Sequence, residues 1–461
     1  MIRTPLVTLS IVAVLCMTAG RALADDAEAI ARHRHVQDIE ALMATTGDDA
    51  LKKFADEHLS PEYRASFPEP KLLLDHLREI RTALTNFGGL LVDRDEQGVM
   101  HMKFLLPAGS RSLTFHMQAG VPYLITAFDL DGGLAPPEPG MEIKPITWET
   151  LAPRMDEEAK NGFSGSVYVV RDGKVVLSKG YGEADRDLLY HNAPNTIFAI
   201  GSTPIDFTRA AVLKLEEKGK LKTSDRISKY FTDAPADKKD ITIDELMSGA
   251  SGLANFHHLP GIDANPDLTW IDRETAVKRI FERPLLFKPG EGTAHSHSAW
   301  VLLAALVEKV SGQSYGDFVQ QELFEPAGMT STFLHEGLRK VSDSRIAIGY
   351  EAETTGQDNS PKYWGRTSWL VMGSGGMAST VEDLAKFITA VHGGTLLAAK
   401  QTKKYGGEGG MWIGGDDRGF MCLHAERGKD MVVLMSNAHK GPGDLPSSVG
   451  HELGKMVLGK N

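Results

Sequence analysis

The sequence predicts an α+β protein with two domains, and three observations support this prediction. The chain has 461 residues, which is long for one domain. Residues 25–130 carry helical patterns followed by several short strand patterns. A stretch rich in proline and glycine at 131–147 then separates this part from residues 148–461, which open with a strand hairpin. We therefore expect a small α+β domain, a linker and a larger C-terminal domain.

Residues 1–24 have the pattern of a secretory signal peptide. Arg3 gives a positive start, a short apolar run covers Leu6–Met17, and Ala22-Leu23-Ala24 forms a small-x-small cleavage site before Asp25. The apolar run is too short to span a bilayer. Leu15 precedes Cys16 where a lipoprotein signal has a small residue, so we do not expect lipid attachment. The sequence predicts a periplasmic or secreted mature protein.

The composition limits the partners of the mature chain. Its net charge of -11 argues against nucleic acid and anionic membranes as partners. Once the signal is removed, Cys422 is the only cysteine, which excludes an intramolecular disulfide and a cysteine-based zinc site. No later stretch is long and apolar enough for a transmembrane helix. We expect no cofactor, and the sequence does not predict the oligomeric state.

The first domain, residues 25–130, is expected to be similar to cystatin or nuclear-transport-factor domains, on fold-level analogy alone. Helices are predicted over Ala27–Thr45 and Lys71–Thr85, the second from leucine and isoleucine residues at helical spacing. The strand patterns that follow cover residues 89–92, 100–106, 112–117 and 123–129.

The C-terminal domain, residues 148–461, opens with a predicted hairpin. Two apolar runs, Gly165–Val170 and Val175–Gly182, flank Arg171-Asp172-Gly173-Lys174. An Asp-Gly pair between such runs is a strong signal for a tight hairpin turn.

Several ordered segments of this domain carry the motifs of one family. They are Phe163–Gly182, Leu246–Leu253 (similar to "LLSHTSGL"), Phe287–Gly290, Val301–Gly312, Leu323–Met329 ("PLGM"), Gly375–Leu384 ("GGLxSTxxDL") and Met431–Asn437. Together they resemble the serine β-lactamase and penicillin-binding-protein superfamily over about residues 150 to 440. The resemblance implies an antiparallel sheet flanked by a helical subdomain, and a serine hydrolase ancestry.

The motif that carries the nucleophile in this family is altered. Ser202 matches the family's catalytic serine, which opens a helix and is followed three residues later by a lysine that shares its proton. Here Ile205 takes the lysine's position. A serine hydroxyl is a poor nucleophile unless a base accepts its proton, so this change removes the usual base.

The second and third motifs are altered as well. The family's Tyr-x-Asn corresponds to His295-Ser296-His297. The family's Lys or His of the third motif is expected within Gly406–Gly410, with Glu408 as the best match. Position then makes His297, Gly409 and Gly410 candidates for substrate binding.

One hypothesis is a non-catalytic homologue. Ser202 then serves only as a helix N-cap before Pro204, and Ile205 joins an apolar stripe with Thr208, Val212 and Leu215. The protein would bind a small ester or amide, or a cell-wall peptide, without turning it over.

Two alternatives remain. In the first, Ser202 hydrolyses an ester or amide with His295 as base and Glu408 orienting the imidazole, as in Ser-His-Asp/Glu enzymes. In the second, His295 and His297, together with His257 or His258, bind a metal. Side chains of a His-x-His segment in extended conformation point to opposite faces, so this site requires the chain to bend.

Overall fold

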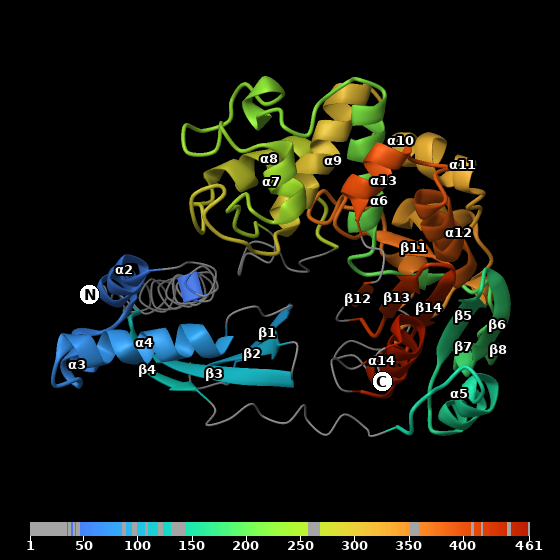
Figure 1. Ribbon diagram of the computed structural model, residues 1–461, viewed down its shortest axis with the longest axis horizontal. Coiled ribbons are helices and arrows are strands. Elements are labelled where there is room, and N and C mark those ends of the chain that lie inside the picture. Colours follow the sequence, from blue (N-terminus) through green and yellow to red (C-terminus); the bar gives the residue numbers. More distant parts are fainter. Residues whose placement is uncertain are drawn as a thin grey trace, which may run out of the picture. The chain divides into compact units, whose positions relative to one another are not determined.

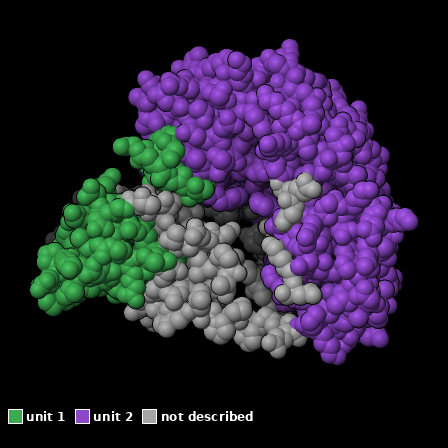
Figure 2. All heavy atoms as spheres, in the orientation of Figure 1, with its two compact units in different colours: residues 1–138, 258–266, 285–294 green, residues 139–257, 267–284, 295–461 purple. Residues whose placement is uncertain are grey.

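The computed structural model describes residues 35, 38–39, 42, 47–84, 89–94, 99–106, 109–118, 123–130, 143–256, 268–350, 359–406, 410–415, 418–439 and 444–459. Contacts divide the chain into two compact units, coloured separately in Figure 2. The first unit comprises residues 1–138, 258–266 and 285–294, and the second comprises residues 139–257, 267–284 and 295–461. Each unit is described by itself below.

The first unit contains helices and a four-stranded antiparallel meander, in the order β1-β2-β3-β4. The helix predicted at Lys71–Thr85 and all four predicted strands of this unit are confirmed. Two further helices, α2 and α3, were not predicted. The expected helix over Ala27–Thr45 lies mostly outside the described residues. The core draws on both layers, for example Phe54 and Leu77 from the helices with Phe115 from the sheet. The elements are α2 (Asp48–His58), α3 (Pro61–Ala65), α4 (Pro70–Leu84), β1 (Gly89–Arg94), β2 (Val99–Leu106), β3 (Gly109–Met117) and β4 (Ile125–Leu130).

A five-stranded antiparallel sheet forms the centre of the second unit, in the order β12-β13-β14-β5-β6 (Figure 1). The predicted hairpin is confirmed: β5 and β6 join through Asp172 and Gly173, both with positive φ, as a two-residue turn of this kind requires. The strand β5 also pairs with β14 near the C-terminus, in a register that places Val170 opposite Met431. The strands are β5 (Gly165–Arg171), β6 (Lys174–Tyr181), β12 (Met411–Gly415), β13 (Met421–Arg427) and β14 (Asp430–Ser436).

Helices cover both faces of this sheet, which explains why β13 is buried along nearly its whole length. Leu423 and Ala425 of β13 join a core cluster with α5 (Leu151–Lys160) and α14 (Leu445–Leu458). Because side chains alternate along a strand, Cys422, His424 and Glu426 point to the opposite face. That face lies against α6 (Pro204–Glu217) and α12 (Val381–His392). The second face therefore contains polar residues within a buried layer.

The remaining described helices form the helical part of the second unit around α9 (Figure 1). None of the helices within the described ranges is both long and apolar enough to cross a bilayer. The longer elements are α7 (Ile243–Ser248), α8 (Arg273–Glu282), α9 (His297–Ser311), α10 (Tyr315–Val319) and α13 (Ala399–Tyr405), and short strands are β7 (Glu183–Asp185), β8 (Tyr190–His191), β9 (Phe198–Ala199), β10 (Phe333–Leu334) and β11 (Met377–Ser379). The fold is α+β with helices around an antiparallel sheet, as predicted.

Candidate functional site

Ser202 lies in the turn that leads into α6 and is partly exposed. The preceding Gly201 has a φ of 50°, and the carbonyl of Ser202 accepts a hydrogen bond from the amide of Ile205 at 3.1 Å. Thr203, not Ser202, occupies the N-cap position, and no side chain caps the helix there. The N-cap interpretation of Ser202 is therefore wrong, although Pro204 does begin the helix as expected.

Ile205, in the position of the family's lysine, is buried with 2% of its surface exposed. Thr208, Val212 and Leu215 are equally buried, so the predicted stripe on α6 is confirmed. An ammonium group in this place would lose its hydration without gaining an evident partner on the stripe. The lysine's place is therefore filled by apolar packing.

The strand β12 approaches Ser202 at Gly414. A Cβ atom on Gly414 would lie 3.3 Å from the backbone nitrogen of Ser202 and 3.5 Å from that of Thr203. Two residues earlier, the Nε1 atom of Trp412 is buried and has no hydrogen-bond partner in the described part of the chain. Glycine at 414 permits this close approach, because a side chain there would crowd the backbone at the start of α6.

The structure describes only part of the segment that was expected to carry the third motif. Glu408 and Gly409 lie outside the described residues. The carbonyl of Gly410 accepts a hydrogen bond from the amide of Glu426 at 3.4 Å, just before β12 begins. The contact between β12 and Ser202 thus lies four residues beyond Gly410.

The second motif lies at the start of α9. The Ser296 hydroxyl caps this helix by accepting a hydrogen bond from Ala299, and the amide of His297 donates to the Asn255 side chain at 2.8 Å. The His295 and His297 rings meet edge to face, with centroids 5.0 Å apart, because the chain bends from an extended segment into a helix between them. His295 has an exposed surface, but the surrounding protein desolvates its ring and lowers the pKa of the imidazole. Within the described residues, no hydrogen bond joins it to Ser202.

The metal hypothesis rests partly on His257 and His258, which lie outside the described residues. Across the described residues, no group of three or more His, Cys, Asp or Glu side chains is arranged to hold a metal ion. The His295–His297 pair alone supplies two ligands, which is fewer than a structural or catalytic zinc site uses.

A buried charged network that was not predicted from the sequence includes Asp206, the residue that follows Ile205. The Nε2 atom of His424 is 3.1 Å from Asp206 Oδ2, and its Nδ1 atom is 3.1 Å from Glu426 Oε2. The other oxygen of Glu426 is 3.4 Å from His392 Nε2. We call these four residues the Asp206–His392–His424–Glu426 network. The available signal was the alternation of polar residues along β13, a strand that is otherwise apolar.

The network shifts the pKa values of its members. Burial alone would lower the pKa of His424, but hydrogen bonds and charges from Asp206 and Glu426 outweigh it and raise this pKa to about 10. Burial would raise the pKa of Glu426, but hydrogen bonds from His392 and His424 lower it to about 2. Both groups are therefore charged at neutral pH.

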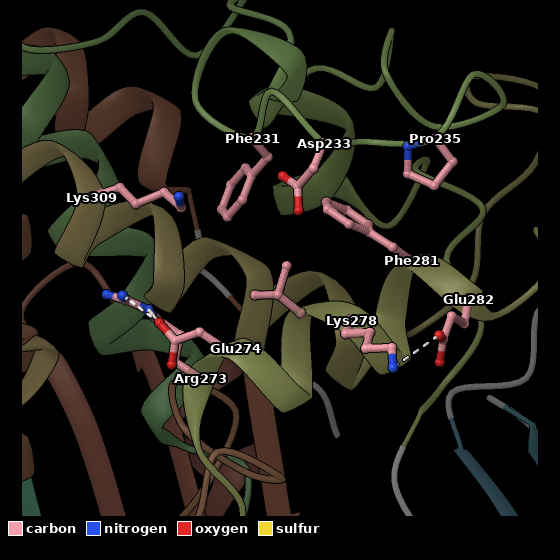
Figure 3. Close-up of a pocket in the computed structure, with 10 residues that line it drawn as sticks. Phe231, Asp233, Pro235, Arg273, Glu274, Lys278, Phe281, Glu282 and Lys309 are labelled. Atoms are coloured by element: carbon pink, nitrogen blue, oxygen red, sulfur yellow. Dashed lines mark hydrogen bonds and ion pairs between the residues drawn. The ribbon is translucent and has the colours of Figure 1, made fainter.

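A separate pocket of about 310 Å³ lies in the helical part of the second unit (Figure 3). Phe231 and Phe281 pack edge to face beside it, and charged side chains of α8 with Lys309 surround the apolar part. None of the candidate residues from the sequence analysis lines this pocket.

Comparisons with known proteins agree with these motifs. The Bacillus subtilis (strain 168) protein PbpX, named after penicillin-binding proteins, is 32% identical over 294 residues, which cover 60% of this chain and 71% of PbpX. Teichoic acid D-alanine hydrolase of Staphylococcus aureus is 29% identical over 242 residues, which cover 52% of this chain and 57% of that protein. This chain thus spans little more than half of the second relative.

A likeness in fold extends to solved structures. The D-amino acid amidase from Ochrobactrum anthropi SV3 superimposes with a TM-score of 0.55 at 19% identity, covering 66% of this chain and 98% of the amidase. The family model described as Beta-lactamase matches residues 149–451, which include Ser202, α9 and the five-stranded sheet. The chain therefore belongs to the β-lactamase family.

Proposed function

We propose that the second unit is an exported, non-catalytic member of this family that binds a D-alanyl-bearing cell-wall ligand at Ser202. One observation carries the proposal. Ile205 is buried in apolar packing where the lysine belongs, and no titratable side chain of the described residues forms a hydrogen bond with Ser202. Without a base the serine hydroxyl stays protonated and a poor nucleophile.

The position of Gly414 supports a new assignment for the third motif. In the family this motif ends in a glycine on a strand near the serine, and Gly414 is the β12 residue that contacts the Ser202 amide. Trp412 then takes the position of the Lys or His. An indole cannot carry the positive charge that helps the family to hold a carboxylate, but it offers an apolar face and one donor. The proposed ligand is accordingly uncharged near Trp412.

The ligand class comes from the relatives. One is named as a teichoic acid D-alanine hydrolase and a structural neighbour as a D-amino acid amidase. We propose that this chain keeps the recognition of a D-alanyl ester or amide and has lost the chemistry. Export fits this ligand because such groups lie outside the cytoplasmic membrane, and the N-terminal signal pattern supports it.

The alternative function is hydrolysis of such an ester or amide by Ser202 with His295 and Glu408 as its proton-handling groups. The partial exposure of Ser202 and the names of the two relatives favour it. In this case activity on small esters rises as an imidazole loses its proton, and His295→Ala removes most of it.

Labelling of Ser202 separates the two functions. The purified protein is incubated with a fluorophosphonate and with a fluorescent penicillin, using Ser202→Ala as the control. Non-catalytic binding predicts the same background signal in both proteins with both reagents. Labelling mapped to Ser202 by mass spectrometry, and absent from Ser202→Ala, would instead support hydrolysis.

Binding is then measured by calorimetry with N-acetyl-D-alanyl-D-alaninamide, in which an amide replaces the terminal carboxylate. We expect the L,L-enantiomer not to bind. Gly414→Val should weaken binding at least about tenfold, since overpacking of a close contact typically costs 1–3 kcal/mol. Gly450→Val, which adds the same side chain in α14 against Leu423 on the opposite face of the sheet, serves as the matched control. Equal binding of the two enantiomers would exclude specific recognition of the D-alanyl group.

A further inference from the structure

His424 is hydrogen-bonded on both ring nitrogens to carboxylates. Its Nε2 atom faces Asp206 and its Nδ1 atom faces Glu426, each at 3.1 Å. An ionised carboxylate can only accept hydrogen bonds, and a neutral imidazole has only one N–H to donate. Both contacts are satisfied at once when the ring is an imidazolium, because only then do both nitrogens donate.

The other polar groups around this ring are consistent with a cation at its centre. From α6, Arg209 lies over the Tyr405 ring of α13 and donates a hydrogen bond to the Tyr405 carbonyl at 3.4 Å. From α12, His392 faces the second oxygen of Glu426. The neighbouring Cys422 thiol stays neutral, since burial raises its pKa to about 12. Two carboxylates therefore face His424.

The location connects this ion network to Ser202. Asp206 follows directly on Ile205, one turn of chain beyond Ser202. The same segment touches the sheet at three successive points: Ser202 at Gly414, Thr203 beside Cys422, and Asp206 at His424. Gly414 and Cys422 are opposite each other in the β12–β13 ladder, so all three contacts fall on one small area of the sheet.

We propose that His424 is a positioning residue: as an imidazolium it ties Asp206 to β13 and thereby holds the first turn of α6, with Ser202, against Gly414. The part that concerns ligand binding rests on the proposed function, whereas the charge state of His424 and its link to α6 do not.

Nuclear magnetic resonance of the wild-type protein tests the charge state without any variant. In protein labelled with ¹⁵N at histidine, we expect both ring nitrogens of His424 to remain protonated at pH 8. A His424 ring that carries one proton at pH 8, or that titrates together with the exposed histidines, would overturn the proposal.

Variants test the positioning role. Removing one partner of a buried ion pair leaves the other charge uncompensated, so His424→Gln should raise the unfolding equilibrium constant on the order of 100-fold. Asp206→Asn combined with His424→Gln should cost less than the two single changes added together. The matched control is His439→Gln, which removes a histidine–carboxylate pair with Asp444, at 2.9 Å, elsewhere in the unit.

The NMR chemical shifts of the Ser202 and Gly414 backbone amides test the positioning role. A general loss of stability leaves these shifts unchanged in the protein that remains folded. We expect His424→Gln to shift both signals in the folded protein, and His439→Gln to leave them in place. Binding of N-acetyl-D-alanyl-D-alaninamide should weaken about tenfold in the same variant. If the wild type does not bind this ligand, the proposed function fails while the amide shifts still decide the positioning role. Unchanged amide signals in folded His424→Gln would contradict it.

Discussion

At the scale of single residues, Ile205 decides which chemistry the chain can retain. Its side chain is 2% exposed and belongs to an apolar stripe that also includes Val212 and Leu215. A lysine on this stripe would have to lose its proton or open the packing, because a buried ammonium without a partner is strongly disfavoured. The neighbouring carboxylate of Asp206 is already hydrogen-bonded to His424.

Ile205→Lys should therefore destabilise the protein without restoring reactivity. We expect a loss of about 3 kcal/mol in the free energy of unfolding, within the range found for buried unpaired charges. Labelling by fluorescent penicillin should stay at the level of Ser202→Ala, since the second and third motifs remain altered. Urea denaturation measures the loss, with Ile205→Leu as a volume-matched control that should cost less than about 1.5 kcal/mol. Strong labelling of Ile205→Lys would show that the lysine alone was missing.

The reactivity of the Cys422 thiol can also be predicted at this scale. The residue is fully buried on β13, and burial raises the pKa of its thiol to about 12. Only a thiolate reacts quickly with alkylating reagents, so native protein at pH 8 should resist iodoacetamide. Addition of urea should make Cys422 react. Rapid alkylation of the native protein, measured by mass spectrometry, would show that this strand opens easily.

The sequence could indicate which residues were altered in the site but not what replaces them. Ser202 and Ile205 could be identified because their spacing of three residues is a local pattern. The Asp206–His424 contact joins residues 218 positions apart, and no local pattern relates them. The third motif was expected around Glu408 because glycine residues surround it, whereas the glycine that contacts Ser202 is Gly414, on the strand itself.

At the scale of elements, β13 links the charged network to the stability of the whole sheet. Its pKa shifts define a pH window. His424 has a folded-state pKa of about 10, above the ordinary value of 6.5, so its contribution is complete below pH 6.5 and is lost as the pH rises toward 10. Glu426 has a folded-state pKa of about 2, below 4.5, so its contribution is complete above pH 4.5 and is lost as the pH falls toward 2.

The contribution of this network to the free energy of unfolding should therefore be largest between about pH 4.5 and 6.5. Urea denaturation at a series of pH values checks this expectation. In His424→Gln the decline between pH 6.5 and 10 should be shallower than in the wild type, because the group that titrates in that range is gone. Parallel stability curves for the two proteins would exclude His424 as the origin of the alkaline decline.

Elements with strong local signals were predicted well. The β5–β6 hairpin follows from Asp172-Gly173, and α4 follows from its helical spacing of leucines. The helix α2 was missed because it begins after Gly47 without a side-chain cap, so the usual start signal is absent. The short strands β9 and β11 depend on pairing with each other, which a single segment of sequence does not reveal.

At the scale of the whole molecule, the signal pattern at residues 1–24 makes export a testable property. Cleavage after Ala24 should give a mature protein that begins at Asp25. N-terminal sequencing of the protein isolated from its native cells checks this. Interrupting the apolar run with Leu9→Arg and Val12→Arg should block processing. Recovery of the native protein with Met1 in place would exclude cleavage.

The pairing of β5 with β14 has a consequence for synthesis. The hairpin β5–β6 leaves the ribosome early, but its other neighbour in the sheet is made some 260 positions later, since Val170 lies opposite Met431. Until then β5 exposes an unpaired edge, and contacts of such long sequence separation form slowly. The second unit can complete its sheet only after β14 has been made. A nascent chain whose sheet is still incomplete can pass through a secretion channel as an unfolded polypeptide.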